Sequence, residues 1–171
     1  MQVDFFKRKF IDKTDAMEFG LCDDSAAGVT KPAYLDVSED REKWIAIVKN
    51  ESQLLVEFYS IDGFLYWKRI DGTDSGRCDG MLCFNGKKNI IFVELKCQSG
   101  DSWRSDGKFQ LKETLEKFFS IYDRTKFLRV EAYLCNKKRQ IHPIRDTDSK
   151  IVYDGIHTVV LRVKRVIDIK E

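Results

Sequence analysis

The chain of 171 residues is long enough for one domain with its own hydrophobic core and short for two. A hydrophobic fraction of 43% and a charged fraction of 34% are typical of a soluble globular protein and exclude a disordered or low-complexity chain. The formal net charge of only +2 argues against a protein that coats nucleic acid through bulk charge, although a local basic groove is compatible with this value.

Cysteine usage and the start of the chain indicate a cytoplasmic location. The five cysteines are odd in number, and no pair of them has the CxxC spacing of a zinc site. Residues 1–10 contain Asp4, Lys7 and Arg8 and lack the long apolar run of a signal peptide or a membrane span. We therefore expect reduced thiols and no membrane partner.

The N-terminal third of the chain permits more than one assignment of secondary structure. Residues 5–19 are compatible with a short helix. The stretch 42–62 fits either a helix or two strands, at 44–48 and 54–59, joined by a turn. Because Ile, Val and aromatic residues dominate this stretch, the hairpin is the favoured interpretation.

From residue 64 the pattern is clearer, and it predicts a mixed sheet. We expect strands at 64–70, 77–85, 89–97, 127–135 and 157–167, and an amphipathic helix at 106–122. Asn85-Gly86 predicts a hairpin turn, and the apolar run from Ile90 to Val93 predicts a central strand. The order of these elements predicts an α/β fold of the α+β type, with a central mixed β-sheet flanked by helices, in a single domain over residues 1–171.

Asp79, Glu94 and Lys96 are the residues with the clearest chemical potential. Glu94 and Lys96 are two apart in an expected strand, so their side chains leave the same face. Asp79 lies about seven residues before the centre of the hairpin loop and Glu94 about seven after it, so antiparallel pairing places their Cβ atoms about 5 Å apart. Two carboxylates at that separation repel each other unless a cation lies between them.

A divalent ion with oxygen ligands is the natural occupant of such a site. Mg²⁺ binds through one or two carboxylates and keeps several waters. It would lower the pKa of a bound water and polarise a phosphate, and Lys96 beside it would orient or deprotonate the attacking water or stabilise negative charge in the transition state. The pattern therefore predicts a site that hydrolyses phosphodiester bonds.

Asp79, a hairpin, Glu94-Leu95-Lys96 and then Gln110 on the following helix resemble the PD-(D/E)xK nuclease superfamily, especially its RecB-type branch. The resemblance covers about residues 64–136 and implies a restriction-endonuclease-like core. It implies that Asp79 and Glu94 bind Mg²⁺ or Mn²⁺, that Lys96 assists the water and that Gln110 supports the site. It also implies a nuclease that acts on nucleic acid, with DNA favoured over RNA. The implied setting is defence, repair or a mobile element, and the protein would act as a homodimer or with a partner protein.

The chain departs from the family pattern in two places. Cys78 stands where the family name has a proline. The family also often has an acidic residue on a helix before the sheet, and the candidates for it here are Glu18, Asp24, Glu42 and Glu51. Glu51 is the best of them if the stretch 42–59 is helical.

Three further residues are candidate nucleic-acid contacts: Arg77, Trp103 and Lys108. Trp103 would stack on a base or pack back onto the fold. Two alternatives to an active nuclease are open. One is a catalytically silent module of the same fold that binds nucleic acid or regulates a larger complex. The other is a solvent-exposed ladder of ion pairs in which Asp79 and Glu94 face Lys96 and Arg77.

Overall fold

The computed structural model describes residues 3–7, 9, 11–138 and 149–170, which form a largely β structure with two mixed sheets and, within these ranges, a single α-helix. The seven-stranded sheet runs in the order β1 (Ile11–Thr14), β5 (Val56–Ser60), β6 (Gly80–Phe84), β7 (Asn89–Lys96), β8 (Arg129–Asn136), β10 (His157–Val163) and β9 (Ser149–Tyr153). The four-stranded sheet runs in the order β11 (Val166–Asp168), β4 (Ala46–Lys49), β2 (Glu18–Cys22) and β3 (Tyr34–Asp36). The helix is α1 (Trp103–Phe119), and η2 (Arg41–Lys43) and η3 (Arg124–Lys126) are short 3₁₀ turns.

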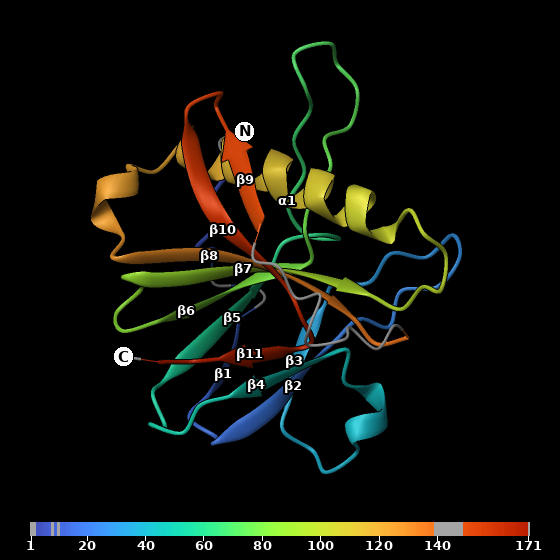
Figure 1. Ribbon diagram of the computed structural model, residues 1–171, viewed down its shortest axis with the longest axis vertical. Helices are drawn as coiled ribbons and strands as arrows, with labels where there is room; N and C mark the ends of the chain where they lie inside the picture. Colours follow the sequence, from blue (N-terminus) through green and yellow to red (C-terminus); the bar gives the residue numbers. More distant parts are fainter. Residues whose placement is uncertain (1–2, 8, 10, 139–148, 171) are drawn as a thin grey trace.

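The seven-stranded sheet lies between α1 and the four-stranded sheet (Figure 1). Strand β7 explains this layered arrangement, because its apolar side chains alternate between two cores, one on each face of the larger sheet. Ile90 and Phe92 pack in the core that contains Leu111, Leu115 and Phe118 of α1. Ile91, Val93 and Leu95 pack in the second core, with Phe19, Leu21 and Val48 of the smaller sheet. An apolar run that is buried on both faces therefore forms a central strand, as the sequence predicts.

The middle of the chain follows the sequence prediction closely. The turn between β6 and β7 has positive φ angles at Asn85, Gly86 and Lys87, a conformation that Asn and Gly adopt at low cost. Strand β7 pairs antiparallel with β6 and parallel with β8, and α1 connects the two parallel strands. The predicted strand–helix–strand unit is thereby confirmed.

Three expectations about the fold are wrong. The described residues between 5 and 19 contain β1 and the start of β2 and no α-helix. Residues 64–70 form no strand and belong to a projecting loop with one isolated bridge, Lys68 to Asp74. Only one helix covers the larger sheet among the described residues, so the sheet is not flanked by helices; its second face is covered by β-strands instead. Helix α1 is neither long nor apolar enough to span a membrane.

The stretch 42–62 does form two strands and a turn, but the strands do not pair with each other. Strand β4 belongs to the smaller sheet and β5 to the larger one. The buried side chain of Asn50 organises the turn between them, because its amide donates to the carbonyls of Ala16 and Leu54 and its oxygen accepts from the Leu54 amide. The expected strand 157–167 divides in the same way, into β10 and β11.

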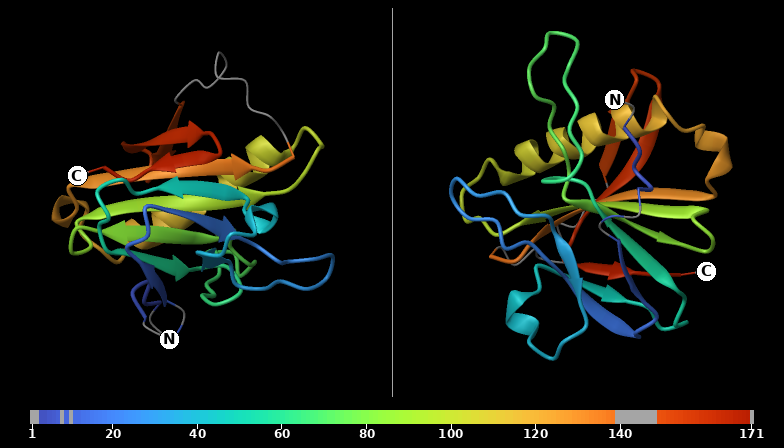
Figure 2. Two further views of the ribbon diagram at one scale, coloured as in Figure 1. Left: turned by 90° about the horizontal axis from the view of Figure 1, so that it is seen from below. Right: turned by 180° about the vertical axis from the view of Figure 1, so that it is seen from behind.

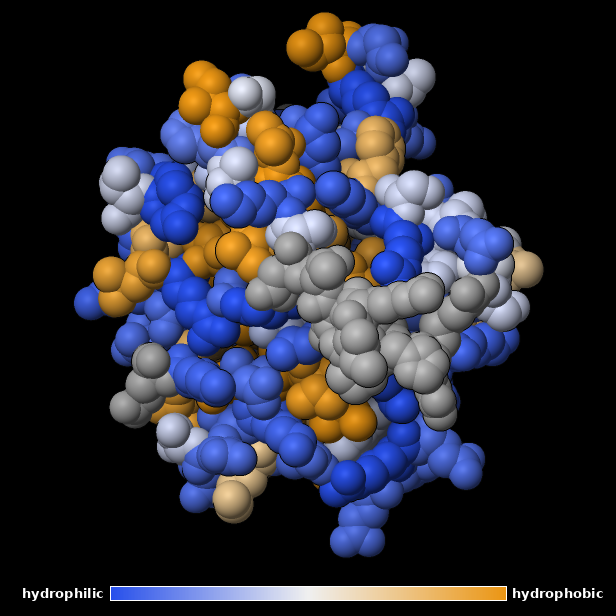
Figure 3. Space-filling model, in the orientation of Figure 1, coloured by the Kyte–Doolittle hydropathy of each residue, from blue (hydrophilic) through white to orange (hydrophobic). Residues whose placement is uncertain are grey.

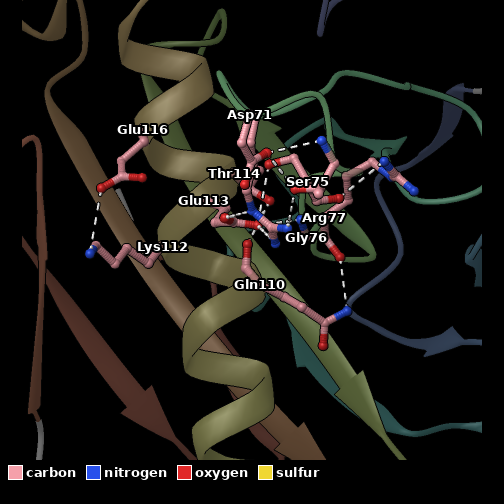
Figure 4. Close-up of polar contacts among 11 residues, drawn as sticks. Asp71, Ser75, Gly76, Arg77, Gln110, Lys112, Glu113, Thr114 and Glu116 are labelled. Atoms are coloured by element: carbon pink, nitrogen blue, oxygen red, sulfur yellow. Dashed lines mark hydrogen bonds and ion pairs between the residues drawn. The ribbon is translucent and has the colours of Figure 1, made fainter.

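Residues 64–76, which we name the arm, project from the body of the protein beyond α1 (Figures 1 and 2). Hydrophobic atoms lie at the end of this projection in Figure 3, and Ile70 at the turn is fully exposed. The base of the arm is held by Glu113 of α1, whose carboxylate binds Arg69 (Nε to Oε1, 2.5 Å), the Ser75 hydroxyl and the Gly76 amide (Figure 4). One carboxylate thus fixes the arm to the helix.

Glu113→Ala should release the arm and lower the free energy of unfolding by about 2 kcal/mol, because hydrogen bonds from charged groups and a backbone amide lose their acceptor. Urea unfolding measures the loss, and amide hydrogen exchange should rise in residues 66–76. The matched control is Glu116→Ala, one turn further along α1, since the Glu116 side chain is 40% exposed and its carboxylate lies 3.6 Å from Lys112. Equal stability and exchange in the two variants would contradict this account of the arm.

Candidate active site

Asp79 and Glu94 lie across from each other where the hairpin of β6 and β7 opens. Gly80 pairs with Val93, so the preceding residue, Asp79, faces Glu94. The Asp79 carboxylate accepts a hydrogen bond from the backbone amide of Leu95 (Oδ2 to N, 2.6 Å). Glu94 is only 1% exposed and Asp79 is partly buried. The register that the sequence predicts is therefore confirmed, and it brings two carboxylates together in a buried setting.

Lys96 joins Glu94 to the helix. Its Nζ lies 2.6 Å from Glu94 Oε1 and donates to Gln110 Oε1 at 2.7 Å. The Gln110 amide in turn donates to the carbonyl of Arg77 at 3.1 Å (Figure 4). The side chains of Glu94, Lys96 and Gln110 thus form one hydrogen-bonded chain. The ion pair of Glu94 with Lys96 is buried, which contradicts the alternative of a solvent-exposed ladder.

A glycine in α1 allows the helix to approach the sheet beside Glu94. A Cβ on Gly107 would lie 2.5 Å from Leu134 Cδ1 and 3.3 Å from Glu94 Cγ, so any other residue at this position would displace the buried Leu134 side chain. Gln110 follows Gly107 by about one turn and so meets Lys96. The hydroxyl of Thr114 then links this part of α1 to the sheet, because it accepts from the Cys78 amide at 2.8 Å.

These groups line a cavity of about 300 Å³ at the end of β7. Asp79, Glu94, Lys96 and Gln110 all lie on its wall. The rest of the wall comes from parts of the chain distant in sequence, including Asp23 and Thr30 of the loop between β2 and β3, which lies near the start of α1 in Figure 2. A larger cavity of about 690 Å³, between the arm and the outer side of α1, contains none of these residues.

Asp23 and Asp62 are acidic wall residues that the sequence did not identify. Asp62 follows β5 and binds the Arg77 guanidinium (Nε to Oδ1, 3.0 Å), and Asp23 follows β2. The charge of Asp62 raises the pKa of Glu94, and that of Asp23 raises the pKa of Asp79. In the sequence each of these residues only follows a strand, which is a weak indication of a site. Their closeness to Asp79 and Glu94 depends on how β2 and β5 pair.

Several expected site residues lie elsewhere. Glu51 is exposed in the turn after β4 and lines a separate cavity with Asp168, so it is not the helix carboxylate of the family pattern. Trp103 is 2% exposed and packs in the core between α1 and the larger sheet, so it packs onto the fold and is not available to stack on a base. Arg77 is engaged by Asp62 and by the Ser75 carbonyl. Lys108 is exposed on α1, as a nucleic-acid contact requires.

Burial dominates the ionisation of the cavity. Loss of solvent raises the pKa of Glu94 to about 7, despite the opposing effect of Lys96. Burial and then the charge of Glu94 hold the pKa of Asp79 well above its ordinary value. Burial lowers the pKa of Lys96, but the charges of Glu94, Asp79 and Asp106 and the hydrogen bond to Glu94 together raise it by more, so its pKa lies above the ordinary value. In the metal-free site both carboxyl groups therefore hold their protons to a higher pH than free side chains do, and the ammonium form of Lys96 is favoured.

The carboxylates fit a divalent ion in one specific respect. Glu94 Oε2 is buried and, among the residues that the structure describes, has no hydrogen-bond partner. Burying such an atom is costly, and a cation beside it would remove that cost. Within the same residues no group of three or more His, Cys, Asp or Glu side chains is arranged to hold a metal, so an ion bound here would take its protein ligands from Asp79 and Glu94 alone. Mg²⁺ accepts one or two carboxylates and completes its shell with water.

In EDTA the protein should lose stability as the pH rises from about 4.5 to about 7, because the pKa of Glu94 is 4.5 for the free side chain and about 7 in the fold. The folded state binds the extra proton, so this contribution is fully present below the lower value and is lost as the pH rises through the upper one. The shift corresponds to about 3 kcal/mol.

The pH profile of urea unfolding tests this expectation. Glu94→Gln cannot ionise, so its profile should be flatter than that of the wild type over this interval. The difference between the two profiles isolates the contribution of Glu94 from that of the other titrating groups. The control variant is Glu116→Gln, which removes the α1 carboxylate that pairs with Lys112. Parallel profiles for the wild type and Glu94→Gln would show that Glu94 titrates as it does in the unfolded chain.

Comparisons of the chain with protein-family models, with curated proteins and with solved structures found no match. The case for a function therefore rests on the residues of the cavity: a buried pair of carboxylates, a charged lysine between them and the helix, and the glutamine that holds the lysine.

Proposed function

We propose that the protein is a nuclease that depends on Mg²⁺ or Mn²⁺ and hydrolyses phosphodiester bonds, with DNA as its main substrate class. The observation that carries the proposal is the buried Glu94 carboxylate, which has one oxygen on Lys96 and the other without a partner among the described residues. The order Asp79, Glu94, Lys96, Gln110 and its resemblance to the PD-(D/E)xK nucleases support the same conclusion. A metal ion held by Asp79 and Glu94 would supply an acidified water and a polarised phosphate.

In this proposal Lys96 acts through its charge. In the metal-free site its pKa lies above the ordinary value, so at neutral pH it is an ammonium ion. Two of its three N–H groups bind Glu94 and Gln110, which leaves one for an oxygen of the substrate. Aimed into the cavity, that group would stabilise the negative charge that develops on the phosphate or on the attacking oxygen.

Gln110 and Glu94 position that ammonium group. Both accept hydrogen bonds from Nζ, one from the helix and one from the strand, so Lys96 loses little freedom when the substrate binds. The same Glu94 carboxyl must give up its proton when a cation binds. Metal affinity should therefore increase as the pH rises through about 7, the pKa of Glu94 in the metal-free protein.

A catalytically silent module that binds nucleic acid is the second candidate. The observation in its favour is that no cluster of three or more metal-binding side chains occurs among the described residues. It predicts that nucleic acid binds without being cut and that Mn²⁺ binding does not depend on Asp79 or Glu94.

The deciding experiment incubates the protein with plasmid DNA, linear duplex DNA, single-stranded DNA and RNA, each with Mg²⁺, with Mn²⁺ or with EDTA. We expect cleavage with either metal and none in EDTA. Calorimetry with Mn²⁺ accompanies it, with wild type and Asp79→Asn compared. Binding of nucleic acid without cleavage, together with Mn²⁺ binding equal in both proteins, would replace the nuclease by the silent module. Absence of both cleavage and nucleic-acid binding would exclude both.

A further inference from the structure

Two exposed aromatic side chains lie on the arm and on α1. Tyr66 on the arm is 67% exposed, and Phe109 on α1 is 50% exposed. Large aromatic rings in water carry a cost that burial would remove, and a pair of them near a reaction site is a typical place for a ligand with flat faces.

Each ring has an arginine over it. The Cζ of Arg77 lies 5.0 Å from the centre of the Tyr66 ring, and the Cζ of Arg69 lies 5.4 Å from the centre of the Phe109 ring. Neither guanidinium is free to move away, since Asp62 holds Arg77 and Glu113 holds Arg69. The rings are therefore supported by fixed cations, which attract the aromatic faces and favour negatively charged ligands.

Each ring is linked to the catalytic network through a neighbouring residue. Phe109 precedes Gln110, which holds Lys96. The guanidinium over the Tyr66 ring belongs to Arg77, and it binds Asp62 on the cavity wall. The backbone carbonyl of Arg77 accepts a hydrogen bond from the Gln110 side-chain amide. A phosphodiester that reaches Lys96 would therefore have its neighbouring nucleotides within the region of these rings.

We propose that Tyr66 and Phe109 form a stacking platform for unpaired nucleobases, and that the substrate is therefore single-stranded nucleic acid. Bases in a duplex already stack on each other and cannot lie flat on a side chain, whereas unpaired bases can. Stacking tolerates any base, so this platform selects strand state and not sequence. The exposed Lys68 and Lys108 flank the rings in the chain and supply charge for the phosphate backbone. This inference rests on the proposed nuclease function for the path of the strand.

The test measures binding and not cleavage, by fluorescence anisotropy in EDTA with labelled oligo(dT), a labelled DNA duplex and labelled oligo(U). Tyr66→Ala and Phe109→Ala should each weaken binding of oligo(dT) by about 5- to 150-fold, the value of one lost stack. Tyr66→Phe and Phe109→Tyr keep a ring and should bind as the wild type does. Leu128→Ala, which shortens an apolar side chain that is 73% exposed, is the control for surface hydrophobicity.

The outcomes separate this inference from the nuclease proposal. Duplex bound as tightly as oligo(dT), or alanine variants that bind like Leu128→Ala, would overturn the platform while metal-dependent cleavage by the wild type still stood. Weakened binding in the two alanine variants, with rescue by the aromatic ones, supports the platform even if no substrate is cut. Tighter binding of oligo(U) than of oligo(dT), with the same variant effects, supports the platform and assigns the strand to RNA. Failure of all three probes to bind overturns the platform.

Discussion

Lys96→Met is expected to reduce the rate of metal-dependent DNA cleavage by about 10²- to 10³-fold, the cost of removing one fixed donor from a developing negative charge. Methionine has a similar length and fills the same partly buried space, so the fold should persist. The change removes the charge that lies 2.6 Å from Glu94 Oε1. Without it the pKa of Glu94 rises further, and its carboxyl group holds its proton more tightly against a metal.

Single-turnover cleavage with saturating Mn²⁺ measures this effect, because excess metal compensates for weaker binding and leaves the role of the ammonium group visible. The matched control is Lys112→Met, on the exposed side of α1, where Lys112 is 3.6 Å from Glu116. We expect that variant to cut at the wild-type rate. Cleavage by a folded Lys96→Met protein at more than a tenth of the wild-type rate would remove Lys96 from the reaction.

Asp79→Asn is expected to change activity and stability in opposite directions. Cleavage should fall by about 10²-fold or more, because one of two metal-binding carboxylates is lost. Without metal, however, the variant should be more stable than the wild type by about 1–2 kcal/mol above neutral pH. Asparagine can still accept the hydrogen bond from the Leu95 amide, while the repulsion between two buried carboxylates disappears.

Urea unfolding at about pH 8, with and without Mn²⁺, tests both halves of this prediction. Metal should stabilise the wild type, because it binds the folded state, and should have little effect on Asp79→Asn. Asp15→Asn alters an exposed carboxylate between β1 and β2 and should behave as the wild type does. A variant that is less stable than the wild type in EDTA, or that Mn²⁺ stabilises equally, would show that Asp79 holds the fold and not a cation.

The region from β6 to β8 was predictable because its signals are local. The Asn85-Gly86 turn sets the register of the hairpin, and the apolar run of β7 marks a strand buried on both sides. The start of α1 was placed three residues late, since Ser102 precedes it and Trp103 begins it. The buried Trp103 ring explains the earlier start, because the first turn carries it into the core.

In the first third of the chain and at its end, the sequence predicted the strands at 44–48, 54–59 and 157–167 but not the sheets that they join. Each of these segments crosses from one sheet to the other, as β4 and β5 do around Asn50 and as β10 and β11 do at the end. A hydrophobic pattern states that a strand has a buried face, but it does not state which sheet covers that face. The predicted strand at 64–70 was wrong for a related reason, because the aromatic side chains of this segment pack against α1 or face solvent instead of entering a sheet.

For the candidate site, strand alternation and hairpin register in the sequence determined that Asp79, Glu94 and Lys96 would meet, because both are short-range geometry. Gln110 was placed beside them by the resemblance to the PD-(D/E)xK nucleases, and the structure brings it to Lys96. Only the tertiary structure decided that Glu94 is buried with one oxygen unpartnered among the described residues, that Asp23 and Asp62 join the wall, and that Tyr66 and Phe109 are exposed. These properties depend on contacts between segments far apart in the chain. Desolvation, which raises the pKa of both carboxyl groups, arises from the whole surrounding fold and from no residue of the motif itself.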